Sequence, residues 1–287
     1  MVILDEAGTS STCEQAVGTE RELRAFARGA PIQRSATLAR VIEADIIPRL
    51  LLARGPVGRA SAPASLEVDA EDIAGFAAMM VALDLRKAEL VVARALESGV
   101  AIETVLLDLL APTAQRLGQM WVDDELTFTD VTVGLCTLQN LLRSVTSGEA
   151  ADPRALFDGR ILLSATPGEQ HTFGVLMLET MFRRAGWDTV GLPLTDTDEI
   201  CAMVGRRDFS VVGFSLSRES ALEDLAGLIA QVRRASRNSS VVVMVGGRVF
   251  NDEPSLVRRV GADITAQDGK GALVASHSAV CSRMQTH

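Results

Sequence analysis

The spacing of apolar residues predicts a helical region in the first half of the chain. From Ser35 onward, apolar residues recur at intervals of three and four, as expected for amphipathic helices. Asp69 and Thr127 stand where two of these helices should begin, and both are good N-cap residues. The predicted helices cover about 38–50, 69–83, 85–96, 102–117 and 127–145, with a Gly- and Pro-rich loop at 55–65.

These helices are close enough in sequence to pack against one another. We therefore expect residues 35–148 to form a helical bundle. Residues 1–34 are mostly small, polar or charged, which predicts a flexible leader rather than part of the bundle.

The pattern changes after a polar linker at 148–159. Ile161–Thr166 is a short apolar run, typical of a buried parallel strand. Further strands are expected near 189–192, 211–215, 241–245 and 263–265, and helices near 173–185, 197–206, 219–236, 253–260 and 271–283. This alternation predicts an α/β fold over residues 158–287, Rossmann-like (flavodoxin-like) with a five-stranded parallel sheet. Ligands of such sheets bind beyond the carboxyl ends of the strands.

The loop after the first strand carries the strongest candidate for metal binding. His171 is one of three histidines, and a single loop histidine is more often an ordinary surface residue. Glu169, however, could accept a hydrogen bond from one ring nitrogen and leave the other for a metal. Gly174 would let the first turn of the next helix approach a bulky group. The candidate residues of this loop are Glu169, Gln170, His171, Thr172, Phe173 and Gly174.

Two further loops should meet this one at the same edge of the sheet. Ser215, Leu216 and Ser217 follow the third strand, and Gly246–Gly247 ends the fourth. A Gly-Gly pair forms a tight turn in many proteins, but here it could also open a slot for a ligand tail.

Composition excludes several classes of function. The net charge of −9, the aromatic content of 4% and the lack of Tyr argue against direct nucleic-acid binding. The four cysteines form no CxxC pair, which indicates free thiols in a reducing cytosol and no zinc or iron–sulfur site. No apolar stretch approaches the ~20 residues of a membrane span, and the N-terminus lacks a secretory signal. We expect a cytoplasmic protein that does not bind membranes.

The three loops together resemble the cobalamin-binding domain of methionine synthase, B12-dependent mutases and B12 photoreceptors. Its signature is Asp-x-His-x-x-Gly, then Ser-x-Leu, then Gly-Gly. Here Glu169 replaces the Asp and Ser217 replaces the Leu, while Ser215 and Gly246 follow at separations close to those of the family. The resemblance implies that His171 replaces dimethylbenzimidazole as the lower cobalt ligand. It also implies that the displaced base lies in a slot lined by Ser215, Gly246 and Gly247.

In this family a helical bundle covers the upper face of the corrin. Trp121, in the segment 119–125 expected to link the last two bundle helices, resembles the Trp that light-sensing relatives place over the upper axial position, although it could equally be a core residue. The Glu-His pair that follows this Trp in those relatives is replaced by Val131 and Thr132. The choice between hydroxo-, methyl- and adenosylcobalamin therefore stays open.

The segment Thr37–Leu50 resembles the start of the helical region in the AerR/PpaA regulators of purple photosynthetic bacteria. The resemblance implies a cobalamin-binding, light- or redox-responsive antirepressor, without enzymatic activity, whose partner is a DNA-binding repressor of the CrtJ/PpsR type. Residues 1–35 are too short for a winged-helix DNA reader, which favours action through such a partner.

Two other functions stay open. A corrinoid methyl-carrier protein of a methyltransferase system has the same plan of bundle and sheet, whereas a mutase would need a substrate barrel for which this chain has no room. A haem sensor could use His171 as an iron ligand. Ser215 and the Gly-Gly pair favour cobalamin, because haem has no nucleotide tail to bury.

Overall fold

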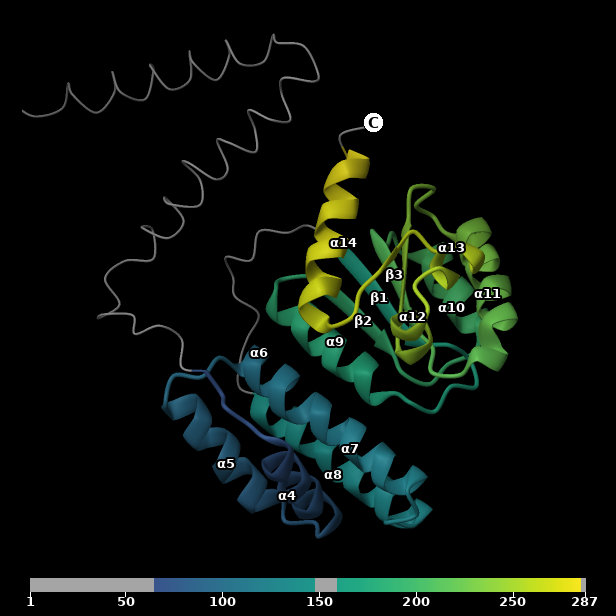
Figure 1. Cartoon of the computed structure of the whole chain (residues 1–287). Coiled ribbons are helices and arrows are strands. Elements are labelled where there is room, and N and C mark those ends of the chain that lie inside the picture. The colour runs from purple at the N-terminus through teal and green to yellow at the C-terminus, as the bar shows by residue number, and fades with distance from the viewer. Residues whose placement is uncertain (1–64, 148–158, 285–287) are drawn as a thin grey trace, which may run out of the picture. The chain divides into compact units, whose positions relative to one another are not determined.

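The computed structural model describes residues 65–147 and 159–284, which are drawn in colour in Figure 1. The predicted leader, the first predicted helix with the segment Thr37–Leu50, and almost all of the loop at 55–65 lie outside the described residues. The described ranges belong to one compact unit, Pro63–His287.

The first part of this unit is helical, as predicted. Its elements are α4 (Ala70–Val81), α5 (Leu85–Glu97), α6 (Ile102–Val105), the π-helical turn η2 (Leu106–Leu110), α7 (Ala111–Val122) and α8 (Phe128–Thr146). The predicted boundary at residue 117 is wrong, because α6, η2 and α7 form one continuous helix that ends at Val122. The connection to α8 is correspondingly short, and Asp124 turns the backbone there with φ +57°.

Both predicted helix caps are confirmed. The Asp69 carboxylate accepts hydrogen bonds from the backbone N–H groups of Glu71 and Asp72, at 2.8 and 2.9 Å. At the start of α8, Thr127 Oγ1 accepts from Asp130 N at 3.2 Å, and the Asp130 carboxylate accepts from Thr127 N at 2.9 Å. These reciprocal bonds satisfy N–H groups that have no partner within the helix.

The second part contains a five-stranded, fully parallel sheet, which confirms the predicted α/β fold. The strands are β1 (Arg160–Ala165), β2 (Asp188–Leu192), β3 (Val211–Ser215), β4 (Val242–Gly246) and β5 (Ile264–Thr265). Their spatial order is β2-β1-β3-β4-β5, the flavodoxin-like order. The direction of winding reverses between β1 and β3, and a ligand crevice is expected at that point.

Helices cover both faces of this sheet (Figure 1). The helices α9 (Phe173–Arg184) and α14 (Gly269–Met284) pack on the face of Leu163 and Met244. The helices α10 (Thr197–Arg206) and α11 (Leu222–Ala235) pack on the opposite face, with the shorter η3 (Glu219–Ala221), α12 (Arg248–Asp252) and α13 (Leu256–Arg259). The helix predicted at 253–260 is wrong in extent. A first helix begins at Arg248, and the chain leaves it before Pro254, which cannot continue the backbone hydrogen bonds.

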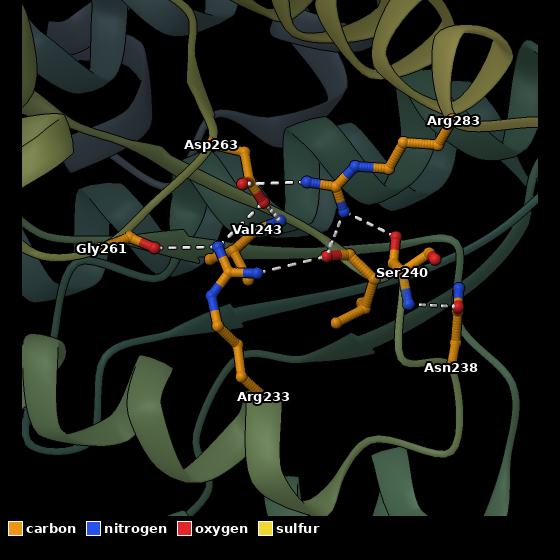
Figure 2. A network of polar contacts seen from close by, with 8 residues as sticks. Arg233, Asn238, Ser240, Val243, Gly261, Asp263 and Arg283 are labelled. Atoms are coloured by element: carbon orange, nitrogen blue, oxygen red, sulfur yellow. Dashed lines mark hydrogen bonds and ion pairs between the residues drawn. The ribbon is translucent and has the colours of Figure 1, made fainter. Parts of the chain in front are cut away.

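Two arginines bind one carboxylate near the amino ends of β4 and β5 (Figure 2). Asp263 pairs with Arg233 of α11 and with Arg283 of α14, each at 2.9 Å, and accepts from Val243 N at 2.7 Å. Arg283 also donates to the carbonyl oxygens of Ser240 and Val241. The carboxyl end of α14 is thereby fixed to the sheet, which also determines where its N-terminus lies at the opposite edge.

The cap of α8 gives a prediction for stability. Thr127→Ala removes the acceptor for Asp130 N and should lower the free energy of unfolding by about 1 kcal/mol, measured by urea denaturation. The matched control is Thr132→Ala on the same helix, whose exposed hydroxyl only donates back to the Phe128 carbonyl. Equal losses in the two variants would show that the capping box is not what stabilises this end of α8.

Candidate functional site

A cavity of about 640 Å³ lies at the carboxyl edge of the sheet. In the sheet domain, its lining comes from the ends of β1, β3 and β4, from the loop that carries His171, from α9 and from the N-terminus of α14. The bundle contributes residues of η2, α7 and α8, which form the bundle wall of the cavity. The cavity therefore occupies the position at the switch between β1 and β3 where ligands of this fold bind.

His171 lines this cavity and is oriented by a buried carboxylate. The His171 side chain is 64% exposed, and its Nδ1 lies 2.5 Å from Glu169 Oε1. Since the carboxylate only accepts hydrogen bonds, Nδ1 carries the proton and the lone pair stays on Nε2. This is the arrangement that prepares a histidine for metal ligation.

The Glu169 carboxylate has hydrogen-bond donors other than the His171 imidazole. The residue is 3% exposed, and its carboxylate accepts hydrogen bonds from the backbone N–H groups of Gln170, His171 and Ser217, at 2.9, 3.1 and 2.9 Å. Burial raises the pKa of Glu169, but the hydrogen bonds from Ser217 and His171 outweigh it, and the pKa lies below its ordinary value. The carboxylate therefore stays ionised and keeps its role as acceptor at neutral pH.

The segment Ser215–Ser217 joins the three loops through its backbone. Thr166 N donates to the Ser215 carbonyl, and Leu216 N donates to the Gly246 carbonyl, both at 3.0 Å. Leu216 is fully buried and packs into the core on the α10 and α11 face of the sheet. Ser217 lines the cavity, and its N–H binds Glu169. Ser217 stands where the family has Leu, but the hydrogen bond to the Glu169 carboxylate comes from its backbone N–H and is therefore kept.

The two glycines of the Gly-Gly pair have different reasons to be glycine. Gly247 has φ +102°, and a Cβ there would lie 2.4 Å from the Leu216 carbonyl oxygen, so this position belongs to a tight turn. A Cβ on Gly246 would approach no heavy atom closer than the Ala266 carbonyl oxygen, at 3.9 Å, and Gly246 lines the cavity. The tight-turn interpretation therefore holds for Gly247, while a slot for a ligand tail at Gly246 stays a prediction.

Small residues lie side by side at the carboxyl edge of the sheet. Ala165, Ser215 and Gly246 stand beside one another across three strands, at the carboxyl edge. Two residues earlier on the same strands, Gly213 lies between Leu163 and Met244, whose side-chain tips come within 2.8 and 2.9 Å of the position of a Cβ. Alternate residues of a strand share a face, so these two rows lie on one surface. All of their members except Ala165 line the cavity.

Most of the predicted site residues lie together. Those that line the cavity are Gln170, His171, Thr172, Phe173, Gly174, Ser215, Ser217, Gly246 and Gly247. Glu169 and Leu216 lie behind it and are buried. Trp121 does not line it: this residue is 49% exposed, in the last turn of α7. Its predicted place over the upper axial position stays a prediction.

Two parts of the cavity lining are not predicted by the sequence, namely the bundle wall and the residues at the start of α14. Leu107, Asp108, Gln115 and Gln139 line the cavity from the bundle. Gln267, Asp268 and Lys270 line it from the start of α14. Gly213 was the one detectable signal, because a glycine inside a strand often marks close approach of a ligand or another chain segment. The bundle residues follow an ordinary helical pattern that gives no such sign.

The donor set fits a metal that brings most of its own ligands. In the described part of the chain, no group of three or more His, Cys, Asp and Glu side chains could enclose a bare ion. A single oriented imidazole beside a cavity suits a cobalt held by a corrin ring, and Ser215 and Gly246 would contact the nucleotide tail of cobalamin if it lies as the resemblance implies. Gly174 is open to the cavity, since a Cβ there would meet nothing within 4 Å.

The two glycines should respond differently to substitution. Gly247→Ala should lower the free energy of unfolding by roughly 2 kcal/mol, because an alanine is strained at this positive φ and its Cβ would meet a backbone oxygen. Gly246→Ala should change stability by less than about 0.5 kcal/mol but weaken cobalamin binding about tenfold or more, because its methyl group enters the slot. Urea denaturation and absorption titrations separate the two effects. Unchanged cobalamin affinity in Gly246→Ala would exclude this glycine from the slot.

The lowered pKa of Glu169 predicts a pH dependence of stability. Its stabilisation is complete above the pKa of an unfolded glutamate, about 4.3, and is lost as the pH falls through the lower folded-state value. Glu169→Gln should cost roughly 2 kcal/mol at pH 7, because charged hydrogen bonds are lost. The difference between the two proteins should shrink when urea denaturation is repeated from about pH 5 down to pH 3. A difference that stays constant would show that the charge of Glu169 does not contribute.

Comparison with known proteins agrees with this geometry. Two models, each described as a B12 binding domain, match residues 73–145 and residues 159–276. A relative in Rhodobacter capsulatus, named "Uncharacterized 20.5 kDa protein in bchF-crtJ intergenic region", is 24% identical over 170 residues, which cover 59% of this chain and 88% of the relative. The monomethylamine corrinoid protein of Methanosarcina barkeri has a similar fold, with a TM-score of 0.60 and 16% identity over 73% of this chain and 100% of the other.

Two other expectations concern the rest of the molecule. None of the described helices has the length and hydropathy that crossing a membrane requires. Cys136, Cys201 and Cys281 are free thiols, as the cysteine spacing predicts. The two matched domains together cover more than half of the chain, and residues of both line the cavity that contains the His171 imidazole. The chain belongs to the family of B12 binding domain proteins, and its cofactor is cobalamin.

Proposed function

We propose that this chain is a light- or redox-responsive regulator that uses cobalamin and acts as an antirepressor on a DNA-binding repressor of photosynthesis genes. The observation that carries the proposal is the relative from Rhodobacter capsulatus, which is encoded between bchF and crtJ in a photosynthesis gene cluster. The B12 binding domains are cofactor-binding modules, and we propose no catalytic activity for this chain.

The charge of the chain supports action through a protein partner. A net charge of −9 opposes approach to a polyanion, since DNA affinity comes largely from basic side chains on phosphates. A repressor of the CrtJ/PpsR type would read the DNA, and this chain would change the activity of the repressor.

The position of the cavity supports a switch. The bundle and the sheet domain both line it, and Phe173, Met177 and Met181 of α9 pack into the core of the bundle. Arg184 of α9 also pairs with Glu103 of α6 at 2.9 Å. A ligand that contacts both walls can shift the bundle only through a difference in its contacts between two states. Bound cobalamin supplies a cobalt centre whose ligation depends on light and redox state, and the bundle wall is where this chain would sense that change.

A corrinoid methyl carrier is the second candidate. It is favoured by the fold similarity to the monomethylamine corrinoid protein, which extends over the whole length of that protein. A carrier would have a methyltransferase as its partner, so the two candidates differ in the protein that each should bind.

A binding experiment with purified proteins tests the proposal. The full chain loaded with cobalamin is immobilised and offered a repressor of the CrtJ/PpsR type, in darkness and after illumination, and under oxidising and reducing conditions. We expect capture of the repressor that changes with at least one of these treatments, and no such change with His171→Ala.

Capture of a corrinoid methyltransferase, with no binding of the repressor under any condition, would contradict the regulator and support the carrier. Direct binding of this chain to promoter DNA at physiological salt, without the repressor, would contradict the proposed route.

A further inference from the structure

The bundle wall of the cavity presents an acid that has no polar partner among the residues the structure describes. Of the two aspartates in the lining, Asp268 accepts a hydrogen bond from Gly271 N at 2.7 Å and caps α14. Asp108 is exposed and makes no hydrogen bond or ion pair with any residue in the described ranges. It lies in the π-helical turn Leu106–Leu110, an irregularity that is often found at functional sites.

Glutamine side chains surround the same cavity. Gln115 and Gln139 line it from the bundle, and Gln170 and Gln267 line it from the sheet domain. None of these four side-chain amides is hydrogen-bonded to a residue that the structure describes. The lining thus combines amides that donate and accept with two carboxylates that only accept, of which Asp268 already binds Gly271 N.

The wall that carries Asp108 is firmly attached. Its neighbours Leu106 and Leu109 are buried in the core of the bundle. Leu107 lies close enough to Gly269 of α14 that a Cβ on this glycine would come within 3.6 Å of it. Asp108 is therefore held at the cavity by the packing on both of its sides.

A corrin carries primary amides on flexible arms around its edge. An ionised carboxylate accepts hydrogen bonds from an amide N–H but repels another carboxylate. We infer that Asp108 and the surrounding glutamines recognise the amide groups at the edge of the corrin, and that Asp108 discriminates against corrinoids in which the facing amide has become a carboxylate. This inference rests on the cobalamin site described above and adds the chemical class that its bundle wall selects.

The separate monocarboxylic acids of cobalamin, each with one amide hydrolysed, are suitable probes. Dissociation constants for cobalamin and for each acid are measured by absorption titration with the wild-type chain and with Asp108→Asn, which has nearly the same shape and no charge. For at least one acid, the wild-type preference for cobalamin should fall by about two- to fivefold in Asp108→Asn. The same preference should weaken as salt is raised from about 0.05 M to 0.5 M, since salt screens exposed charges.

Asp198→Asn is the matched control. Asp198 is an exposed aspartate in the first turn of α10, which packs on the face of the sheet away from the cavity. This variant changes the net charge equally and should keep the wild-type preferences.

If the wild-type chain and Asp108→Asn both bind cobalamin and show identical preferences for every acid, the role of Asp108 is overturned while the cobalamin site stands. The same conclusion follows if Asp198→Asn relaxes the preference as much as Asp108→Asn. None of these measurements involves the repressor, so a failure of the proposed regulation would leave their result unaffected.

Discussion

The site depends on one buried carboxylate. Glu169 would be costly to enclose without partners, because a charge removed from water must be compensated by hydrogen bonds. Four N–H groups compensate it: those of Gln170, His171 and Ser217 from the backbone, and Nδ1–H of the His171 ring. The same contacts therefore solvate the charge, order the loop and determine which imidazole nitrogen is left for a metal. Each of these effects would be lost with the carboxylate.

The topology of the sheet explains why these groups meet. In the order β2-β1-β3-β4-β5, the carboxyl ends of β1 and β3 are neighbours, so the N–H of Ser217 can reach the carboxylate of Glu169 from another loop. The next neighbour, β4, contributes Gly246, whose missing side chain leaves space in the cavity. At the opposite edge, Asp263 holds α11 and α14 through Arg233 and Arg283. The residues that surround His171 therefore come from a sheet whose covering helices are tied to it by ion pairs, and the bundle contributes a further part of the cavity lining.

The sequence was most informative where local pattern and topology act together. Short apolar runs separated by helices predicted the parallel sheet, and the edge at which ligands bind followed from that fold. Glu169 could be identified as the partner of His171 because the two residues are close in sequence. Ser217 could not be identified as the donor to Glu169, since its contact is made by a backbone N–H and does not depend on the type of side chain.

Other features could not be predicted because they arise from packing across the cavity. The fit of Gly247 against the Leu216 carbonyl distinguishes it from Gly246, although the two residues are identical in the sequence. Asp108 and the glutamines of the lining occupy ordinary polar positions of their segments. Only the fold shows that they share one cavity with His171. Pro254 indicated a break in the helical pattern. The sequence did not indicate that a separate helix already begins at Arg248.

The most direct test of the central claim is the absorption spectrum of cobalamin bound to the full chain, compared with that bound to His171→Ala and His277→Ala. The account predicts a spectrum of cobalamin with its own base displaced and a histidine on cobalt for the wild type and for His277→Ala. His171→Ala should lose the features of histidine ligation. The same histidine-ligated spectrum in His171→Ala would contradict the assignment of this residue and the role given to Glu169 behind it.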